Sequence, residues 1–135
     1  MLRFFPDIGN DHRDLAALQT YVLTLSPFDR GRIQSNGVPT EPVSLAARRG
    51  WDVFQRARCT ACHPPPAYLV PRTADVGTGG PIDVPGLRGV AERAPYGHDG
   101  RWATLEDATA AMLRLQKLEL SFDERLQLQE YLKLL

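Results

Sequence analysis

The chain has 135 residues, the length of one ordinary domain, and its 43% hydrophobic and 24% charged residues are close to the average for globular proteins. Its 16 basic and 16 acidic side chains balance to a formal net charge of zero, which excludes a sequence-independent nucleic-acid binder because such a protein needs a large basic excess. No stretch approaches the ~20 apolar residues of a membrane span, and residues 1–7 lack the apolar run and cleavage site of a signal peptide.

The first predicted element is an amphipathic helix over Asp11–Leu25. Its apolar positions recur at helical spacing, at Leu15, Leu18, Val22 and Leu25. Either Asn10 or Asp11 is a suitable N-cap, and Pro27 is expected to end the helix. Residues 26–43 contain three prolines and two glycines and have no apolar periodicity, so they are predicted to form a linker.

A second helix is predicted over Ser44–Arg58. The positions expected to be buried in it are Leu45, Ala46, Trp51 and Phe54. The following segment, Pro64–Pro95, is too rich in proline and glycine for a regular helix or a central strand. A loop of this length between helices indicates a binding function.

Two more helices are predicted near the end of the chain. Thr104–Lys117 begins with Thr104 as its N-cap, and Ser121–Leu135 begins with a capping box in which Ser121 pairs with Glu124. No alternating strand pattern is present anywhere, so the predicted fold class is all-α.

The first and last predicted helices resemble each other in sequence. Leu18–Val22 matches Leu128–Leu132, and at the same offset Asp14 matches Glu124 and Leu25 falls opposite Leu135. A chance match between two amphipathic helices is one explanation. The other is that Asp11–Leu25 is the closing helix of a preceding, related domain, which divides the chain into a leading segment, 1–43, and a domain, 44–135.

The motif that carries chemistry is Cys59-Thr60-Ala61-Cys62-His63, which has the Cys-x-x-Cys-His pattern of c-type haem attachment. Two thiols three residues apart lie on one turn, so each of them can add to a vinyl group of the porphyrin. The adjacent imidazole is then placed beneath the iron as its proximal ligand.

Two other kinds of chemistry use the same cysteine spacing. A thioredoxin-like redox site expects a βαβ surround and a helix that runs on from the cysteines, whereas Pro64–Pro66 follow here at once. A structural zinc site needs four protein ligands, and only His12 and His98 remain to complete one. If the motif does not bind haem, the alternative interpretation is that the chain is a small metal-binding or interaction module.

Several sequence blocks resemble a known family. Gly50–Phe54, ahead of the cysteine motif, is similar to the first helix of a class I cytochrome c. The blocks Asp75–Gly79, Val84–Ala91, Ala94–Gly100 and Thr104–Met112 resemble the bacterial di-haem cytochrome c peroxidase family. The resemblance covers about residues 44–135 and corresponds to the family's C-terminal domain, whose haem receives electrons and passes them on. The family's peroxide-reacting haem lies in its N-terminal domain, and this chain has no second Cys-x-x-Cys-His motif.

The resemblance implies a class I cytochrome c fold, with helices around one covalently bound haem and a long proline- and glycine-rich loop. It also implies that Met112 is the sixth iron ligand. The sequence agrees, because Met1 is the only other methionine and Met112 shares a helix face with Leu105, Ala108 and Leu115, so it should point inward. The alternative is a plain core methionine.

Other polar residues in the resembling blocks have open roles. His98 is a competing iron ligand, a group hydrogen-bonded near the haem edge, or simply a turn residue. Arg88 and Arg101 either pair with the haem propionates or are solvated surface charges.

The function implied is one-electron transfer through Fe(III)/Fe(II) with a redox partner protein or an adjacent haem domain. An iron ligated on both sides by His63 and Met112 cannot bind peroxide, so this domain alone is expected to have no peroxidase turnover. The alternative is a haem peroxidase with an open or displaceable sixth site, in which His98 or Asp99 assists proton transfer. Since bacteria attach haem c outside the cytoplasm, we expect a periplasmic or otherwise extracytoplasmic location and a processed or truncated chain.

Overall fold

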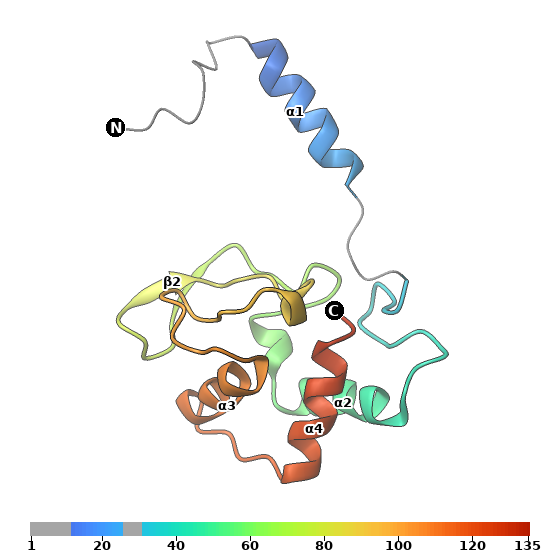
Figure 1. Ribbon diagram of the computed structural model, residues 1–135, viewed down its shortest axis with the longest axis vertical. Helices are drawn as coiled ribbons and strands as arrows, with labels where there is room; N and C mark the ends of the chain where they lie inside the picture. Colours follow the sequence, from blue (N-terminus) through green and yellow to red (C-terminus); the bar gives the residue numbers. More distant parts are fainter. Residues whose placement is uncertain (1–11, 26–30) are drawn as a thin grey trace.

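The computed structural model describes residues 12–25 and 31–135. In chain order the elements are helices α1 (His12–Thr24) and α2 (Leu45–Arg56), the 3₁₀ turn η1 (Cys59–Ala61), strands β1 (Thr73–Asp75) and β2 (Pro81–Asp83), the 3₁₀ turn η2 (Val90–Glu92), and helices α3 (Leu105–Leu115) and α4 (Phe122–Leu132) (Figure 1). The four predicted helices are therefore present. The proposed N-cap residues of the first helix, Asn10 and Asp11, and the proline expected to end it, Pro27, lie outside the described residues.

The helix starts follow from local side-chain capping. Ser44 and Thr104 accept hydrogen bonds from the backbone N–H groups three residues ahead, and Ser121 forms a complete capping box with Glu124. Each of these bonds satisfies a donor that the first turn of a helix leaves without a partner. The predicted caps at Thr104 and Ser121 are confirmed.

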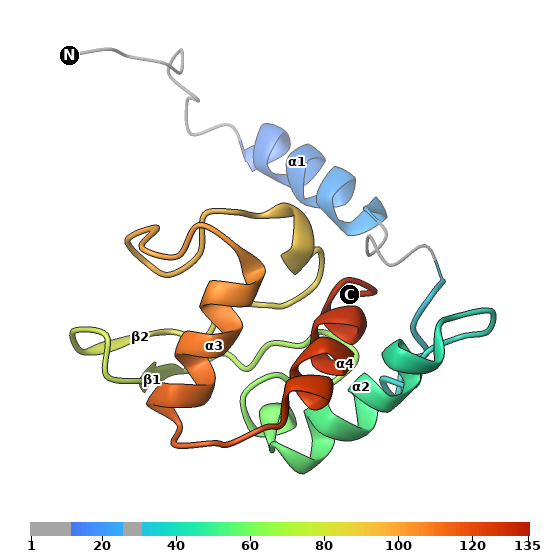
Figure 2. The ribbon, with the colours of Figure 1, turned by 60° about the horizontal axis from the view of Figure 1, so that its bottom comes forward.

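The predicted all-α class is confirmed only in part, because the structure also contains a small two-stranded sheet. β1 and β2 pair in antiparallel register within the Pro64–Pro95 segment, and the hairpin lies on the α3 side of the molecule, away from α2 (Figure 2). Gly79 and Gly80 have φ angles of 118° and 120° in the connecting turn, a region that side-chain-bearing residues avoid. Strands of three residues are too short to show a clear alternation of apolar and polar residues, so the pattern was not visible in the sequence. The chain is mainly helical with one small sheet.

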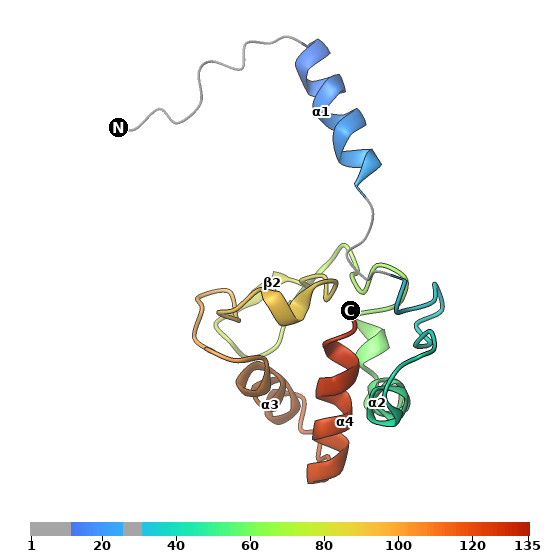
Figure 3. The same cartoon turned by 45° about the vertical axis from the view of Figure 1, so that its right-hand side comes forward.

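The core forms where α2 packs along α4 (Figure 3). Phe54 and Tyr131 are at most 1% exposed, and their ring centroids are 5.3 Å apart. At Gly50 an added Cβ would lie 2.0 Å from the carbonyl oxygen of Gln127, so the two helix backbones approach as closely as a glycine allows.

The predicted burial in α2 needs one correction. Phe54 is buried as expected and Trp51 and Ala46 are partly buried, but Leu45 is 54% exposed. The buried stripe of the helix is made by Ala47, Gly50, Val53 and Phe54. Since successive residues turn by 100° around a helix, Leu45 lies off this stripe.

Residues 31–43, predicted to be a linker, are packed against the helices. Ile33 is only 6% exposed and belongs to the core cluster. Gly37 lies against the Trp51 ring, and its carbonyl oxygen accepts a hydrogen bond of 2.8 Å from the Tyr131 hydroxyl. A single apolar residue among prolines and glycines carries no periodic signal, which explains why the sequence did not reveal this packing. The packed unit extends back beyond residue 44.

α1 differs from α4 despite their similar sequences. Leu18, Tyr21 and Val22 are more than half exposed, whereas Leu128, Tyr131 and Leu132, their counterparts in α4, are buried. Within residues 12–25 and 31–135, no helix has both the length and the apolar character needed to cross a membrane.

Candidate cofactor site

The cysteine motif occupies one tight turn after α2. Arg58 has a φ angle of 58°, in the left-handed region, and this residue redirects the chain from α2 into η1. The backbone N–H groups of Cys62 and His63 both donate to the carbonyl oxygen of Cys59, at 3.2 and 2.9 Å. The three motif residues that carry the thiols and the imidazole are therefore held on one compact backbone turn.

The imidazole of His63 has a defined hydrogen-bond partner. Its Nδ1 lies 3.1 Å from the carbonyl oxygen of Tyr68, which can only accept, so this hydrogen bond requires the proton on Nδ1. Burial lowers the pKa of His63 below its ordinary value, although the backbone carbonyls of Tyr68 and Pro85 oppose this shift. A neutral imidazole with a free Nε2 is the form that binds iron.

The two cysteines lie in different surroundings. Cys59 packs against the core, and burial raises the pKa of its thiol to about 11. Cys62 accepts a hydrogen bond at 3.4 Å from Nη2 of Arg72, which also donates to the carbonyl oxygen of Ala61. No disulfide joins the two thiols. A redox-active Cys-x-x-Cys site requires a lowered thiol pKa, and Cys59 shows the opposite shift.

Tyr68 is a close neighbour of His63 that the sequence did not reveal. Its carbonyl accepts from His63, while its hydroxyl is fully buried, 2.8 Å from the Tyr131 hydroxyl. The N–H of Tyr68 donates to the carbonyl oxygen of Pro64, which folds the chain back toward the imidazole. The available signal was a tyrosine five residues after His63, beyond a proline turn, but its contact with α4 depends on the tertiary structure.

Met112 lies on α3 and is partly buried, as are Ala108 and Leu115 of the predicted inward face. The most buried residues of α3 are Leu105, Ala111 and Leu113. At 100° per residue, Ala111 and Leu113 lie on either side of Met112, so the predicted inward face lies within this buried arc, although Met112 itself is only partly buried.

Arg88 is tied to the loop that follows the cysteine motif. Its Nε donates to the carbonyl oxygen of Pro66 at 2.8 Å, and its guanidinium lies 5.4 Å from the centroid of the Tyr68 ring. It therefore covers Tyr68 and is not a solvated surface charge.

His98 and Arg101 occupy a turn closed by the bridge between Tyr96 and Trp102. His98 is exposed. Arg101 forms an ion pair of 2.6 Å with Asp99, and its hydrogen bonds lower the pKa of Asp99 to about 2. A carboxylate with so low a pKa is ionised at neutral pH and is a weak base, so Asp99 is poorly matched to general acid–base catalysis.

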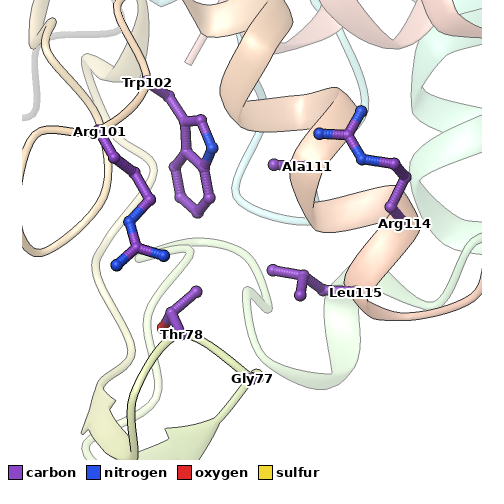
Figure 4. A pocket seen from close by; sticks show the side chains of 7 residues that line it. All are labelled: Gly77, Thr78, Arg101, Trp102, Ala111, Arg114 and Leu115. Atoms are coloured by element: carbon purple, nitrogen blue, oxygen red, sulfur yellow. The ribbon is translucent and has the colours of Figure 1, made fainter.

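A pocket of about 250 Å³ lies between this turn, the hairpin loop and α3 (Figure 4). It is lined by Gly77, Thr78, Arg101, Trp102, Ala111, Arg114 and Leu115. Thr78 is 7% exposed, and its buried hydroxyl has no hydrogen-bond partner among the described residues. A wider hollow of about 580 Å³ runs along the other side of the hairpin, between Leu69–Thr73 and Asp83–Val84.

The cysteine turn has the side chains that covalent attachment of a haem requires, two free thiols and an adjacent imidazole. Neither of the two pockets described above is lined by these residues. In the part of the chain that the structure describes, no group of three or more His, Cys, Asp or Glu residues is placed to hold a metal ion directly. A haem iron does not need such a group because the porphyrin supplies four of its ligands.

Comparison with known proteins gives no family assignment. No family model matches the chain, and no curated protein matches it. The resemblance to the di-haem cytochrome c peroxidase family remains a hypothesis based on the sequence blocks.

Proposed function

We propose that the chain is a haem c electron-transfer domain of the kind found in di-haem cytochrome c peroxidases, with a class I cytochrome c fold. The observation that supports this proposal most directly is the turn Cys59–His63, which carries two thiols and a neutral imidazole. The hydrogen bond from Nδ1 to the Tyr68 carbonyl leaves Nε2 as the donor atom, which is the usual arrangement around a metal-binding histidine.

Each residue has a defined role under this proposal. Cys59 and Cys62 are the covalent anchors, His63 is the proximal ligand, and Met112 of α3 is the sixth ligand. The haem supplies an iron that alternates between Fe(III) and Fe(II). Tyr68 orients the imidazole, and the packed α2–α4 core fixes Tyr68 through the Tyr131 hydroxyl. Thioether ligation by methionine raises the potential, which suits an electron carrier.

The environment of Asp99 supports electron transfer over peroxidase chemistry. Asp99 and His98 were the candidates for proton transfer in the peroxidase alternative. Asp99 is ion-paired with Arg101 and has a pKa of about 2, and His98 is exposed in a surface turn. Asp99 is therefore a weak base at neutral pH and is poorly matched to proton transfer.

The proposal is tested by producing the chain in a bacterial periplasm together with a haem-attachment system, because we expect the protein to mature outside the cytoplasm. Mass spectrometry should then show one covalently bound haem. The double variant Cys59→Ala/Cys62→Ala should have none, and Arg49→Gln, an exposed change on α2, should retain it. A chain that emerges from this system without covalent haem would refute the proposal.

Measurement of peroxide turnover by the purified domain distinguishes electron transfer from the alternative function, a haem peroxidase. The electron-transfer proposal expects reversible reduction and no peroxide consumption. Rapid conversion to a high-spin spectrum with peroxide consumption would favour the peroxidase.

A further inference from the structure

Helix α1 has an apolar face that no other part of the described chain covers. Leu15, Leu18, Tyr21, Val22 and Leu25 are each more than half exposed, and every side chain that the structure describes in α1 is exposed. Figures 1 and 3 show the helix apart from α2, α3 and α4. A helix of this length is only marginally stable alone in water, and in proteins most helical stability comes from packing an apolar face. The exposed face of α1 therefore suits a docking contact.

α4 shows what kind of contact this face makes. The buried residues of α4 and of the end of the chain are Leu128, Gln129, Tyr131, Leu132 and Leu135. Their counterparts, when Leu18 is aligned with Leu128, are Leu18, Gln19, Tyr21, Val22 and Leu25. Four of these five are identical, and the fifth replaces leucine by valine. At the other positions from 14 to 24 no residue is identical, so the identity is confined to the side chains that are buried around α4.

General amphipathicity does not explain this pattern. An amphipathic helix needs apolar residues on its inner face and has no need there for a glutamine or a tyrosine hydroxyl. In α4 both groups have specific partners. Nε2 of Gln129 donates to the carbonyl oxygen of Leu105 at 3.4 Å, and the Tyr131 hydroxyl donates to the carbonyl oxygen of Gly37 at 2.8 Å. α1 therefore repeats the side chains that form the hydrogen bonds of α4 as well as its apolar contacts.

The charge at the start of the two helices matches as well. Glu124, in the first turn of α4, forms an ion pair of 2.8 Å with Arg56 of α2. Asp14 is the corresponding residue in the first turn of α1, and its side chain is exposed. A carboxylate at this position is complementary to an arginine at the position of Arg56 in a partner helix. The face of α1 thus matches an α2-type helix in both shape and charge.

We propose that α1 is a docking helix for a second domain with the fold of residues 31–135, and that it takes on that domain the place that α4 has on this one. The partner helix should have a glycine at the crossing point, as at Gly50, and an arginine where α2 has Arg56. A second copy of this chain does not fit, because its α2 is already covered by α4. The contact does not require haem.

A helix transplant tests the proposal, with α2 of this chain as the probe for the partner helix. In the full chain, residues 124–135 are replaced by the sequence of residues 14–25. This exchange changes eight of the twelve residues but only one that is buried, Leu132→Val. The transplanted chain should unfold cooperatively with a Tm within about 10 °C of the parent, because it loses one buried methylene group and a few surface contacts.

The matched control is the same transplant displaced by one residue, with the sequence of residues 15–26 in place of 124–135. Its composition is nearly the same, but its contact face is turned by about 100° away from α2. This chain should have no cooperative unfolding transition. Equal Tm values for the two transplants would mean that any amphipathic helix can cover α2, and the proposal would be wrong.

A further transplant that retains Glu124 and Arg125 covers the case in which the first one does not fold. It restores the capping box and the hydrogen bond from Arg125 to the carbonyl oxygen of Leu120, so a weakened helix start is then no longer the cause. This chain should fold. If it also fails, α1 does not carry the contact face of α4, and the proposal is overturned.

Light scattering of the full chain tests the other occupant, a second copy. We expect a monomer at micromolar concentration, because α4 already covers the only α2 that a second copy offers. A dimer that Leu18→Arg dissociates, while Leu126→Arg leaves it intact, would show that α1 docks on a second copy and not on a different domain. Leu126 is the control because it is exposed to a similar extent on α4, at 50% against 56% for Leu18.

Discussion

The hydroxyl of Tyr131 links three parts of the core. Its hydroxyl donates to the carbonyl oxygen of Gly37 and accepts from the hydroxyl of Tyr68, and both rings are fully buried. Burial, followed by the bond with Tyr68, raises the pKa of Tyr131 well above its usual range. The hydroxyl is therefore neutral, and it joins the segment 31–43 to α4 and to the loop after the cysteine motif.

The two tyrosines differ in what their removal leaves behind. Tyr131→Phe removes the hydrogen bonds to both the Tyr68 hydroxyl and the Gly37 carbonyl oxygen and should lower the free energy of unfolding by about 2–3 kcal/mol. Tyr68→Phe keeps the bond from Tyr131 to Gly37 and should cost only about 1 kcal/mol. Urea denaturation of both variants measures the difference. Equal losses would mean that the two hydroxyls do not form this chain of bonds.

Met112 gives a spectroscopic prediction at the scale of one residue. Met112→Ala in the haem-loaded chain should abolish the weak far-red charge-transfer band of sulfur ligation and lower the midpoint potential, because a thioether ligand favours Fe(II). The matched control is Leu115→Ala, a partly buried neighbour on the same helix. An unchanged spectrum in Met112→Ala would remove this residue from the ligand set.

At the scale of elements, the crossing of α2 and α4 depends on Gly50. In most helices an alanine in place of glycine is stabilising by about 1 kcal/mol. Here the added Cβ would meet the Gln127 backbone at 2.0 Å, so Gly50→Ala should lower the free energy of unfolding by about 3 kcal/mol. Gly86→Ala is the matched control, since its Cβ would find only ordinary contacts at 3.7 Å or more. A stabilising Gly50→Ala would show that the helices are not so close.

The start of α4 gives a prediction about acid stability. Glu124 completes the capping box and pairs with Arg56 of α2 at 2.8 Å, and the hydrogen bond with Arg56 is the main reason that its pKa falls from 4.5 to about 2. A lowered pKa in the folded state contributes stability above the unfolded pKa, which is lost as the pH falls from about 4.5 toward 2.

Glu124→Gln should therefore reduce the loss of stability over this range of pH, because glutamine can still cap the helix but does not titrate. Glu119→Gln, an exposed change in the preceding loop, is the control. Thermal melts between pH 2 and pH 6 provide the measurement, and parallel profiles for wild type and Glu124→Gln would contradict it.

The elements also show what the sequence could predict. The helices and the caps at Thr104 and Ser121 were predictable because capping and periodicity are encoded within a few residues. The cysteine turn was predictable for the same reason. The hairpin was not, because its strands have three residues each and β2 begins with Pro81. The contacts of Tyr68 involve residues from distant elements, and no local pattern specifies those neighbours.

At the scale of the whole molecule, the extent of the packed unit can be tested by truncation. A chain of residues 31–135 should keep the Tm of the full chain, because every described side chain of α1 is exposed. A chain of residues 44–135 should lose about 3 kcal/mol or more, since it lacks Ile33 in the core and the Gly37 carbonyl that Tyr131 binds. Equal stability of the two truncated chains would indicate that the domain begins at residue 44, as the sequence predicts.

Tyr68 has a consequence for how the proposed iron ligand would respond to changes elsewhere in the protein. The main-chain carbonyl oxygen of Tyr68 is hydrogen-bonded to Nδ1 of His63, and its side-chain hydroxyl is hydrogen-bonded to Tyr131 of α4. A displacement of α4 would therefore move Tyr68 and change its hydrogen bond with the imidazole of His63. The basicity of Nε2, and with it the redox behaviour of a bound iron, would change before the molecule lost its folded structure. Substitutions of Phe54, whose ring packs against the rings of Tyr68 and Tyr131, would then appear as altered electrochemistry in a protein that is still fully folded.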